Sequence, residues 1–389
     1  MLKRKLLALL LVLTIVVLSA CGNSTTTTET TTETSTETTE TTETTEEVSG
    51  EVPHLIFGWG NELHTGMSQL SFVAPELFEN QSTRLIPIGD SQMELVKDGK
   101  RLAIFDFIVT SSGADAVTLM SQDNLDAVFC SSTAVMSGYD SGADIKILGP
   151  VQSGGVSIVA AKNAPYNTFE ELIEYAKSNP EPIMAGYHSP VSSPRIVLEY
   201  ALKEADITVS GDAADYNADV LMSDLKGLSN LIPSLSSGQV ELWAGPVPHP
   251  QNAEAQDIGK IIAKLDDLPG GKWKDFPCCT FNCRQDLIDE HPEVVQALAE
   301  VATYVHDYAQ NYREETADLL SEFMGLDKAV LMENDTTYST SVNENFIHGM
   351  NTYVLAMNDM GKFTGRLKDK TPEEVLDLVF DFKFFGEDY

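Results

Sequence analysis

Short apolar runs recur along the chain from residue 54 onward, separated by longer polar and amphipathic stretches. Each run has four to nine residues and is rich in Val, Ile, Leu and Phe, which is typical of strands buried on both faces of a parallel sheet. The predicted strands are 54–59, 84–88, 101–109, 125–130, 145–148, 156–160, 182–186 and 240–244.

Helix signals lie between these runs. Asn167 and Thr168 form an N-cap ahead of a segment with early acids and a late lysine, and Pro194 opens another first turn. The predicted helices are 113–121, 169–177, 195–204, 231–236, 294–312 and 373–379, and the chain is mainly helical from about residue 286. The alternation predicts an α/β fold of mostly parallel sheets covered on both faces, with ligands bound beyond the carboxyl ends of the strands.

The first residues have the pattern of an export signal. Lys3, Arg4 and Lys5 precede a 13-residue apolar run that is too short for a comfortable transmembrane helix. The run ends in Leu-Ser-Ala-Cys-Gly at 18–22, which resembles the lipobox of bacterial lipoproteins. The resemblance implies removal of residues 1–20 and lipid attachment to Cys21, which would anchor the protein on the extracytoplasmic face of the cell membrane. An ordinary signal peptide and an uncleaved anchor remain alternatives.

Residues 21–51 are expected to be a disordered linker. Residues 24–47 contain only Thr, Glu and two Ser, so no apolar group offsets the entropy of ordering the chain. The repelling Glu side chains would extend this segment as a spacer between membrane and folded body. Low-complexity sequence without a role is the alternative.

The charge of the chain excludes several partners. The 389 residues carry 25 Lys and Arg against 59 Asp and Glu, a formal charge of −34. Since residues 24–47 contribute only seven of the acids, the body itself is strongly acidic. Binding to nucleic acid or to an anionic membrane surface needs the opposite charge, so neither is expected.

Motifs of common enzymes do not occur in the sequence. The segment around His188 and Ser189 is no Gly-x-Ser-x-Gly nucleophile elbow, and Gly58 and Gly60 lack the third glycine of a dinucleotide-binding loop. We therefore expect neither catalysis nor a cofactor.

Four cysteines follow Cys21: Cys130, Cys278, Cys279 and Cys283. They could be reduced, form disulfides or hold a metal, but their spacing is not that of a zinc ribbon. We expect no metal and favour a strand over residues 277–282 whose small thiols pack in the core.

Four segments, in order, resemble the solute-binding proteins of ATP-driven bacterial importers, in the branch of nitrate, sulfonate, taurine and thiamine-precursor binding proteins. The segments are 125–133, 161–172, 235–246 and 287–298. The resemblance implies a two-lobed, periplasmic-binding-protein-like (type II) α/β clamp with two crossover strands and a helical C-terminal segment. Residues 52–150 and 249–389 would form the first lobe and residues 151–248 the second. Glu241, where the family more usually has Asp, and the long 80–110 segment depart from the pattern.

In such a clamp, residues at the strand ends and crossovers would face the ligand. Serines at helix starts can equally be caps, Trp59 can equally belong to the core, and Arg195 can equally pair with Glu199. The first crossover would contain Gly154 and Gly155, and the second would be 244–249. The candidate ligand-binding residues are Trp59, Asn61, His64, Ser131, Ser132, Thr133, Gly154, Gly155, His188, Ser189, Ser192, Ser193, Arg195 and Pro246.

The resemblance implies a monomeric receptor that delivers a small solute to an ABC permease in the membrane. A sulfonate, a nitrate-like anion and a thiamine precursor are the candidate solutes. An anion would need local N–H and hydroxyl donors, because the acidic body repels it. A surface sensor with the same clamp, and an enzyme related to thiamine-pyrimidine synthesis, are the alternatives.

Overall fold

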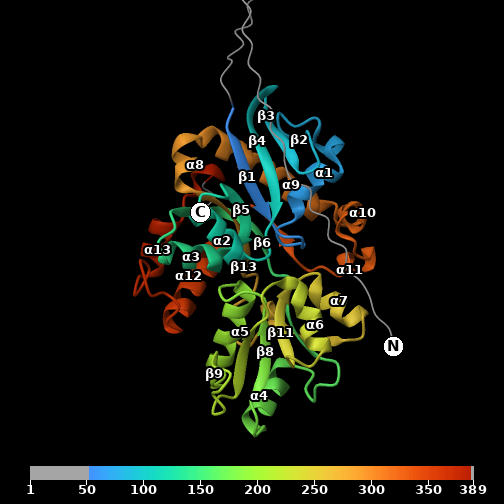
Figure 1. The fold of residues 1–389 in the computed structure, drawn as a ribbon, viewed down its shortest axis with the longest axis vertical. Helices are drawn as coiled ribbons and strands as arrows, with labels where there is room; N and C mark the ends of the chain where they lie inside the picture. Colours follow the sequence, from blue (N-terminus) through green and yellow to red (C-terminus); the bar gives the residue numbers. More distant parts are fainter. Residues whose placement is uncertain (1–51, 387–389) are drawn as a thin grey trace, which may run out of the picture. The chain divides into compact units, whose positions relative to one another are not determined.

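The computed structural model describes residues 52–386, which form two lobes, each built around one β-sheet (Figure 1). The predicted signal, the lipidation site Cys21 and the predicted linker lie outside the described residues. Within residues 52–386, none of the helices combines the length and hydrophobicity needed to cross a bilayer. The described residues thus carry the predicted two-lobed α/β fold.

The first lobe contains a mixed sheet in the order β14-β6-β13-β5-β1-β4-β3-β2. The central strand β1 runs parallel to β4 and β5, and β13 is antiparallel to both β5 and β6. The strands are β1 (His54–Trp59), β2 (Thr83–Pro87), β3 (Gln92–Lys97), β4 (Lys100–Val109), β5 (Ala127–Ser131), β6 (Ile145–Ser153), β13 (Pro277–Arg284) and β14 (Thr337–Tyr338).

This sheet is less parallel than the sequence predicts. Strand β3 is antiparallel to both β2 and β4, and it was not predicted. A tight turn joins β3 to β4 through Asp98 and Gly99, whose φ angles of 50° and 78° are those of a hairpin turn. The long 80–110 segment therefore extends the sheet edge as an antiparallel ribbon.

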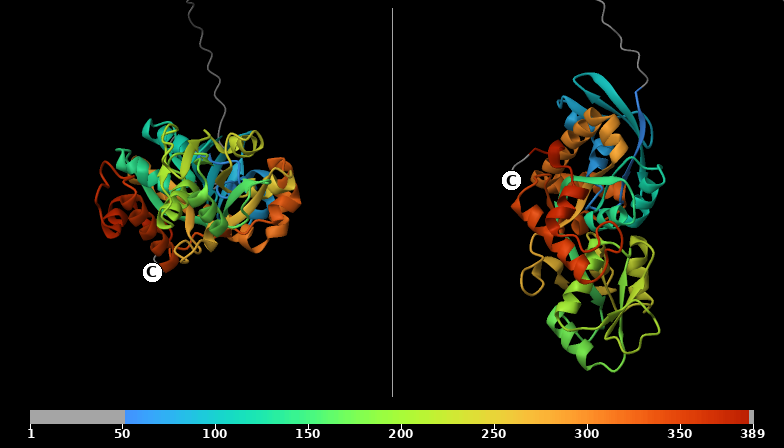
Figure 2. Two further views of the ribbon diagram at one scale, coloured as in Figure 1. Left: turned by 90° about the horizontal axis from the view of Figure 1, so that it is seen from below. Right: turned by 90° about the vertical axis from the view of Figure 1, so that its left-hand side faces the viewer.

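Helices cover the first sheet, and most of them come from the C-terminal part of the chain, as predicted. In Figures 1 and 2 the orange helices lie beside the blue N-terminal strands, whereas the red helices lie beside green segments of the chain. The helices are α1 (Leu70–Val73), α2 (Gly113–Ser121), α3 (Ser132–Asp140), α8 (Gln285–Glu290), α9 (Pro292–Asn311), α10 (Arg313–Met324), α11 (Lys328–Met332), α12 (Glu344–Asp359) and α13 (Pro372–Val379). Short 3-10 helices are η1 (Met67–Gln69), η2 (Pro75–Phe78) and η5 (Phe382–Phe384).

The second lobe contains a sheet in the order β12-β7-β11-β8-β10-β9. Strands β11, β8, β10 and β9 are parallel, whereas β7 is antiparallel to both β11 and β12. The strands are β7 (Val156–Ala161), β8 (Ile183–Tyr187), β9 (Val209–Ser210), β10 (Val220–Asp224), β11 (Leu242–Pro246) and β12 (Gly259–Lys264). The helices are α4 (Phe169–Ser178), α5 (Ser193–Glu204), α6 (Leu231–Ser236) and α7 (His249–Ala255), with η3 (Leu228–Asn230) and η4 (Leu265–Asp267).

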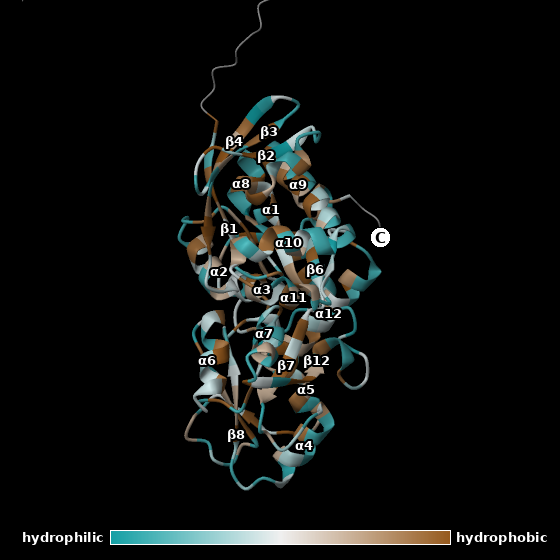
Figure 3. Cartoon of the chain, turned by 90° about the vertical axis from the view of Figure 1, so that its right-hand side faces the viewer, coloured by the Kyte–Doolittle hydropathy of each residue, from teal (hydrophilic) through white to brown (hydrophobic). Residues whose placement is uncertain are grey.

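Hydropathy explains how these helices pack. Hydrophobic and hydrophilic residues alternate along α4, α9 and α10 (Figure 3). In α9 the residues that repeat at helical spacing, from Val294 to Ala309, are buried. Each helix therefore covers its lobe with one apolar face.

Within residues 52–386, the chain crosses between the lobes twice. The first crossover lies between β6, which ends at Ser153, and β7, which begins at Val156. The predicted second crossover at 244–249 is wrong, because α7 and β12 follow β11 within the second lobe. Hydrogen bonding of β12 to β7 covers an edge of the second sheet that would otherwise be unpaired. The return to the first lobe comes after Lys264, so the strands of the second lobe extend beyond the predicted boundary at residue 248.

Candidate functional site

A cavity, which we call the central cavity, opens where the strand ends of the two lobes meet. Its first-lobe lining follows β1, β4 and β5, and its second-lobe lining follows β8 and β11. Since β13 runs antiparallel to β5, its amino end reaches the same place. The lining residues are Gly60, Glu62, His64, Thr65, Thr110, Ser112, Gly113, Phe129, Cys130, Ser131, His188, Ser192, Pro194, Leu228, Pro246, Cys278 and Cys279. The cavity thus occupies the position where α/β folds bind ligands.

Five of the sequence-predicted residues line the central cavity: His64, Ser131, His188, Ser192 and Pro246. Each of them follows a parallel strand of one of the two sheets or is the last residue of such a strand. The strand-end argument therefore placed these side chains correctly in space; whether they contact a ligand stays a prediction.

Other predicted residues connect the two lobes beside the cavity. Thr133 donates a hydrogen bond to the carbonyl oxygen of Val191 at 2.6 Å, and the hydroxyls of Ser131 and Ser193 are 2.9 Å apart. The Ser193 backbone N–H also donates to Ser131 Oγ at 3.1 Å. These groups belong to the start of α3 in the first lobe and the start of α5 in the second. The bonds hold the two lobes together in this conformation.

Two further predicted hydroxyls are buried. Ser132 Oγ donates to the carbonyl oxygen of Cys278 at 3.3 Å, whereas Ser189 Oγ has no hydrogen-bond partner and does not line the cavity. At the first crossover, the Gly154 N–H donates to Phe276 O at 3.0 Å, away from the cavity lining. Ser132 and Gly154 therefore have structural roles.

Three predicted contacts lie away from the cavity. Trp59 is buried in the first-lobe core, stacked on Phe107 with ring centroids 4.6 Å apart, because β1 turns that side chain into the sheet packing. Asn61 is exposed to solvent. Arg195 lies over the ring of Tyr187 and pairs with Glu199 at 3.3 Å, which is the i,i+4 pairing given as its alternative role.

The sequence did not point to several of the lining residues. Thr110 and Ser112 follow the end of β4, so the same strand-end rule could have found them. Glu62 and Thr65 lie in the loop that supplied His64. Cys278 and Cys279 were expected in the core, and no sequence signal showed that their strand begins at the cavity.

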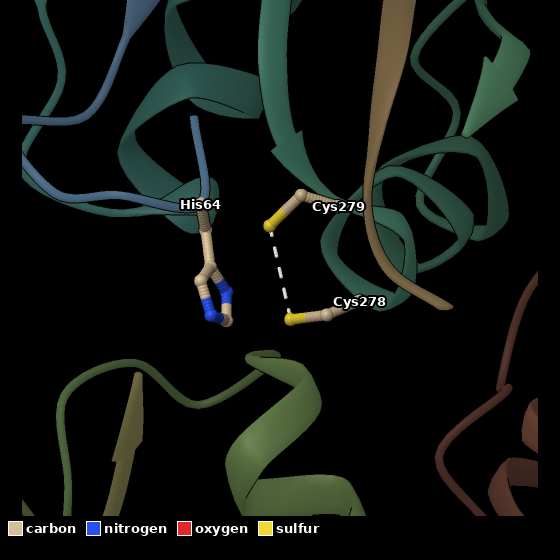
Figure 4. A group of neighbouring side chains, drawn as sticks. All are labelled: His64, Cys278 and Cys279. Atoms are coloured by element: carbon tan, nitrogen blue, oxygen red, sulfur yellow. Dashed lines mark hydrogen bonds between the residues drawn. The ribbon is translucent and has the colours of Figure 1, made fainter. Parts of the chain in front are cut away.

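His64, Cys278 and Cys279 form a buried group that we call the thiol cluster. Their ligand atoms all lie within 4.8 Å of one another, and the Cys279 Sγ donates to Cys278 Sγ at 3.7 Å (Figure 4). The imidazole faces the two sulfur atoms (Figure 4). Gln152 Nε2 donates to His64 Nδ1 at 2.6 Å, and His64 Nε2 donates to the carbonyl oxygen of Gly155 at 2.9 Å. All four described cysteines are free thiols.

Proton affinities within the thiol cluster are coupled. The hydrogen bond from Cys279 outweighs burial and lowers the pKa of the Cys278 thiol well below its ordinary value, with a further contribution from His64. Donating that bond, together with burial, raises the pKa of Cys279. Burial by itself lowers the pKa of His64, but the hydrogen bond and charge of Cys278 raise it overall. Cys278 is thus the group that most readily carries a negative charge.

Burial shifts the pKa values of Glu62 and His188, two further titratable groups at the cavity, toward their neutral forms. Burial raises the pKa of Glu62, although Thr65 and the backbone N–H of His64 both donate to its carboxylate. Burial and then the charge of His249 lower the pKa of His188 to about 3. None of the lining residues, which all fall within the described range, is a lysine or an arginine. The central cavity therefore offers imidazole, hydroxyl and thiol groups rather than fixed positive charge.

The sequence matches the family model of the NMT1-like family over residues 88–324. None of the curated proteins compared matches the sequence.

Solved binding proteins share the fold at low sequence identity. A ligand-binding component of an ABC-type import system from Staphylococcus aureus, with zinc bound, has a TM-score of 0.66 at 15% identity over 87% of this chain and 99% of that one. The nitrate-binding protein NrtA from Synechocystis PCC 6803 has a TM-score of 0.65 at 14% identity over 86% of this chain and 88% of that one. The alkanesulfonate-binding protein SsuA from Xanthomonas axonopodis pv. citri, bound to MOPS, has a TM-score of 0.63 at 12% identity over 86% of this chain and 100% of that one.

Proposed function

The chain belongs to the NMT1-like family, and on that premise we propose that it is an extracytoplasmic solute-binding protein of an ABC importer. It would capture a small molecule between its lobes and deliver it to a permease. The fold supports this proposal, since neighbours that share it include components and binding proteins of import systems.

One observation carries the proposal: the central cavity is lined by both lobes, at the ends of their parallel strands. A molecule bound there contacts both lobes at once, so its binding energy favours the closed form over the open one. The bonds that Ser131 and Thr133 make to the α5 end of the second lobe would form in the same step. Capture and closure are thereby one event.

Anchoring through lipid on Cys21 is part of the proposal. The lipobox-like sequence at residues 18–22 and the preceding apolar run support it. The acidic linker would then keep the folded body, at the extracytoplasmic face, within reach of the permease.

The lining of the cavity limits the chemistry of the solute. Without a lysine or arginine in the lining, a free anion such as nitrate or a sulfonate would depend on hydroxyl and N–H donors alone. His188 has a neutral imidazole whose Nδ1 has no hydrogen-bond partner. Together with the thiol cluster, it favours a solute that can bind to imidazole and thiol groups.

Native mass spectrometry of the purified chain and small-angle X-ray scattering test the proposal. We expect a bound small molecule, and a more compact protein when it is present than after its removal. His188→Ala should weaken binding, whereas His54→Ala, at the far end of β1, should not. Deletion of the gene should abolish uptake of the same molecule.

If the solute closes the lobes but deletion of the gene leaves uptake of that solute unchanged, the result would instead support a surface sensor. Chemical turnover of the bound molecule would support an enzyme. Either result would contradict the proposal of an import receptor.

A further inference from the structure

Two adjacent cysteines point their thiols to the same place, which a regular strand does not allow. Neighbouring side chains of a strand alternate between the two faces of a sheet. The pairing of β13 with β6 shifts register between Pro277 and Cys279 and again between Cys279 and Thr280. Such irregularities re-aim side chains, often next to functional sites. Here the irregularity brings the sulfurs of Cys278 and Cys279 to 3.7 Å from each other.

The separation of the two sulfurs matches a metal site. Two thiolates bound tetrahedrally to one zinc-class ion, with bonds of about 2.3 Å, have their sulfur atoms roughly 3.8 Å apart. A disulfide would require a separation of about 2.0 Å. The observed 3.7 Å therefore requires almost no movement of either cysteine to bind a metal ion.

His64 supplies a third donor atom, and a hydrogen bond that orients its ring is already present. Its Nε2 donates to the Gly155 carbonyl at 2.9 Å, and a backbone carbonyl is a usual partner of a metal-bound imidazole. The Nδ1 lone pair, which accepts from Gln152 Nε2 at 2.6 Å, is the one that a metal would take in place of that bond. All three ligand atoms lie within 4.8 Å of one another, so small side-chain rotations complete the site.

The donor set selects soft and borderline ions. Two sulfurs and one imidazole suit zinc or copper(I), whereas calcium and magnesium require oxygen ligands. The nearby Glu62 carboxylate already accepts from Thr65 and from the His64 backbone N–H. Because Cys278, Cys279 and His64 all line the central cavity, a tetrahedral ion held by these three has its fourth position on the cavity side.

We propose that His64, Cys278 and Cys279 bind a zinc-class metal ion at the wall of the central cavity, and that this ion, free or within a small chelate, is the solute. This inference rests on the proposed function and names its solute class. The fourth coordination position takes water when the ion is free and a donor atom of the chelator when it is not.

Cobalt(II) is the first probe, used on the full chain after chelator treatment and with its thiols reduced. We expect one cobalt ion per chain, an intense sulfur-to-cobalt charge-transfer band and the ligand-field bands of a tetrahedral site. Added zinc should displace cobalt and abolish these bands. A spectrum without the charge-transfer band would overturn the proposal.

Matched variants assign the site. Cys278→Ser and Cys279→Ser should each lose intensity in the charge-transfer band. Gln152→Ala removes the bond that competes with the metal for His64 Nδ1, so it should retain the band and should not weaken cobalt binding. Cys283→Ala is the control, because this thiol is equally buried in β13 but lies outside the thiol cluster. Thermal melts establish that each variant is folded. Equal loss in the control and the cluster variants would contradict the assignment.

Scattering with zinc alone, and with zinc plus free histidine as chelator, identifies the form of the solute. Closure with zinc alone indicates the free ion, and closure only with both indicates a chelate. Metal binding without closure in either arm overturns the ion as solute. If a non-metal molecule closes both the wild type and Cys278→Ser, the proposed receptor function stands and this inference fails.

Discussion

His64 Nε2 lies 2.9 Å from the backbone carbonyl oxygen of Gly155, so a side chain of the first lobe is hydrogen-bonded to the crossover that leads into the second. Gly155 has a φ angle of 69°, which favours glycine. An added Cβ would lie 2.1 Å from Thr336 Oγ1 and 2.8 Å from His64 Nε2. The cavity wall and the crossover are therefore coupled through one backbone position.

Gly155→Ala is expected to destabilise the protein and weaken solute binding. The left-handed backbone costs alanine about 1–2 kcal/mol, and the contacts with Thr336 and His64 add to that cost. Gly238→Ala is the control, because its φ of 73° is similar but nothing lies near its Cβ. Urea unfolding and solute titration measure both effects. Equal destabilisation by the two substitutions would show that the close contacts at Gly155 do not matter.

Removing the hydroxyl bonds between the lobes should favour the open form. Ser131→Ala together with Thr133→Val deletes the contacts to Ser193 and Val191. The double variant also loses the bond from the Ser193 N–H to Ser131 Oγ. At about 1 kcal/mol for each of these three bonds, the equilibrium should move by roughly 150-fold. Scattering of the solute-free protein should then show a larger radius of gyration.

Ser137→Ala is the matched control for that variant, because its hydroxyl bonds only to Thr133 O within α3, at 2.8 Å. This variant should scatter like the wild type. An unchanged radius of gyration in the double variant would mean that these bonds do not hold the lobes together.

His306 should make the protein less stable in mild acid. Burial lowers its pKa to about 4, against about 6.5 in the unfolded chain. Between these values the unfolded state binds the proton more readily, so stability falls as pH drops through 6.5 toward 4. From pH 7 to pH 5 this residue should cost about 2 kcal/mol.

Urea unfolding of wild type and His306→Gln at the two pH values checks this expectation. The variant should lose less stability than the wild type, whereas exposed His54→Gln should behave like the wild type. An equal loss of stability between pH 7 and pH 5 in the wild type and both variants would contradict the role of His306.

Asp266 should destabilise the protein at neutral and alkaline pH. Burial, followed by the charges of Asp335, Asp275 and Asp267, raises its pKa to about 7. The unfolded chain ionises near pH 4, so the folded state loses stability as pH rises from about 4 to 7. Asp266→Asn should therefore be more stable than the wild type at pH 8, by about 1 kcal/mol after allowing for solvent screening, and equal to it at pH 4.

Thermal melts at both pH values measure this difference. Asp267→Asn, an exposed neighbour, is the control and should show little pH-dependent gain. A gain for Asp266→Asn that persists at pH 4 would rule out its carboxylate charge as the cause.

Local patterns predicted most elements of the fold. The predicted strand 54–59 coincides with β1, and the helix predicted at 169–177 is α4, capped by Thr168, whose hydroxyl accepts from the Glu171 N–H. Such signals depend on residues that are close together in the sequence, so they can be recognised from the sequence alone. The strand β3 was missed although Asp98-Gly99 is a hairpin signal, and β12 was missed because its pairing with β7 joins segments about a hundred residues apart.

Strand direction and position decided how much of the cavity could be foreseen. The strand-end rule located Ser131 and His188, because both follow parallel strands whose carboxyl ends meet at one edge. The rule failed for Trp59. Whether the side chain at this last residue of β1 faces the cavity or the core depends on its packing against Phe107.

The sequence by itself determined the α/β alternation, the acidic charge and the strand ends where a cavity forms, because these depend on residue order and composition alone. Only the tertiary structure decided that Cys278 and Cys279, which are buried in the core as expected, also line the cavity and meet His64. That meeting depends on an antiparallel strand entering from the second lobe, and on a register shift against β6. Residues more than two hundred positions apart come together through packing, and no local pattern encodes it.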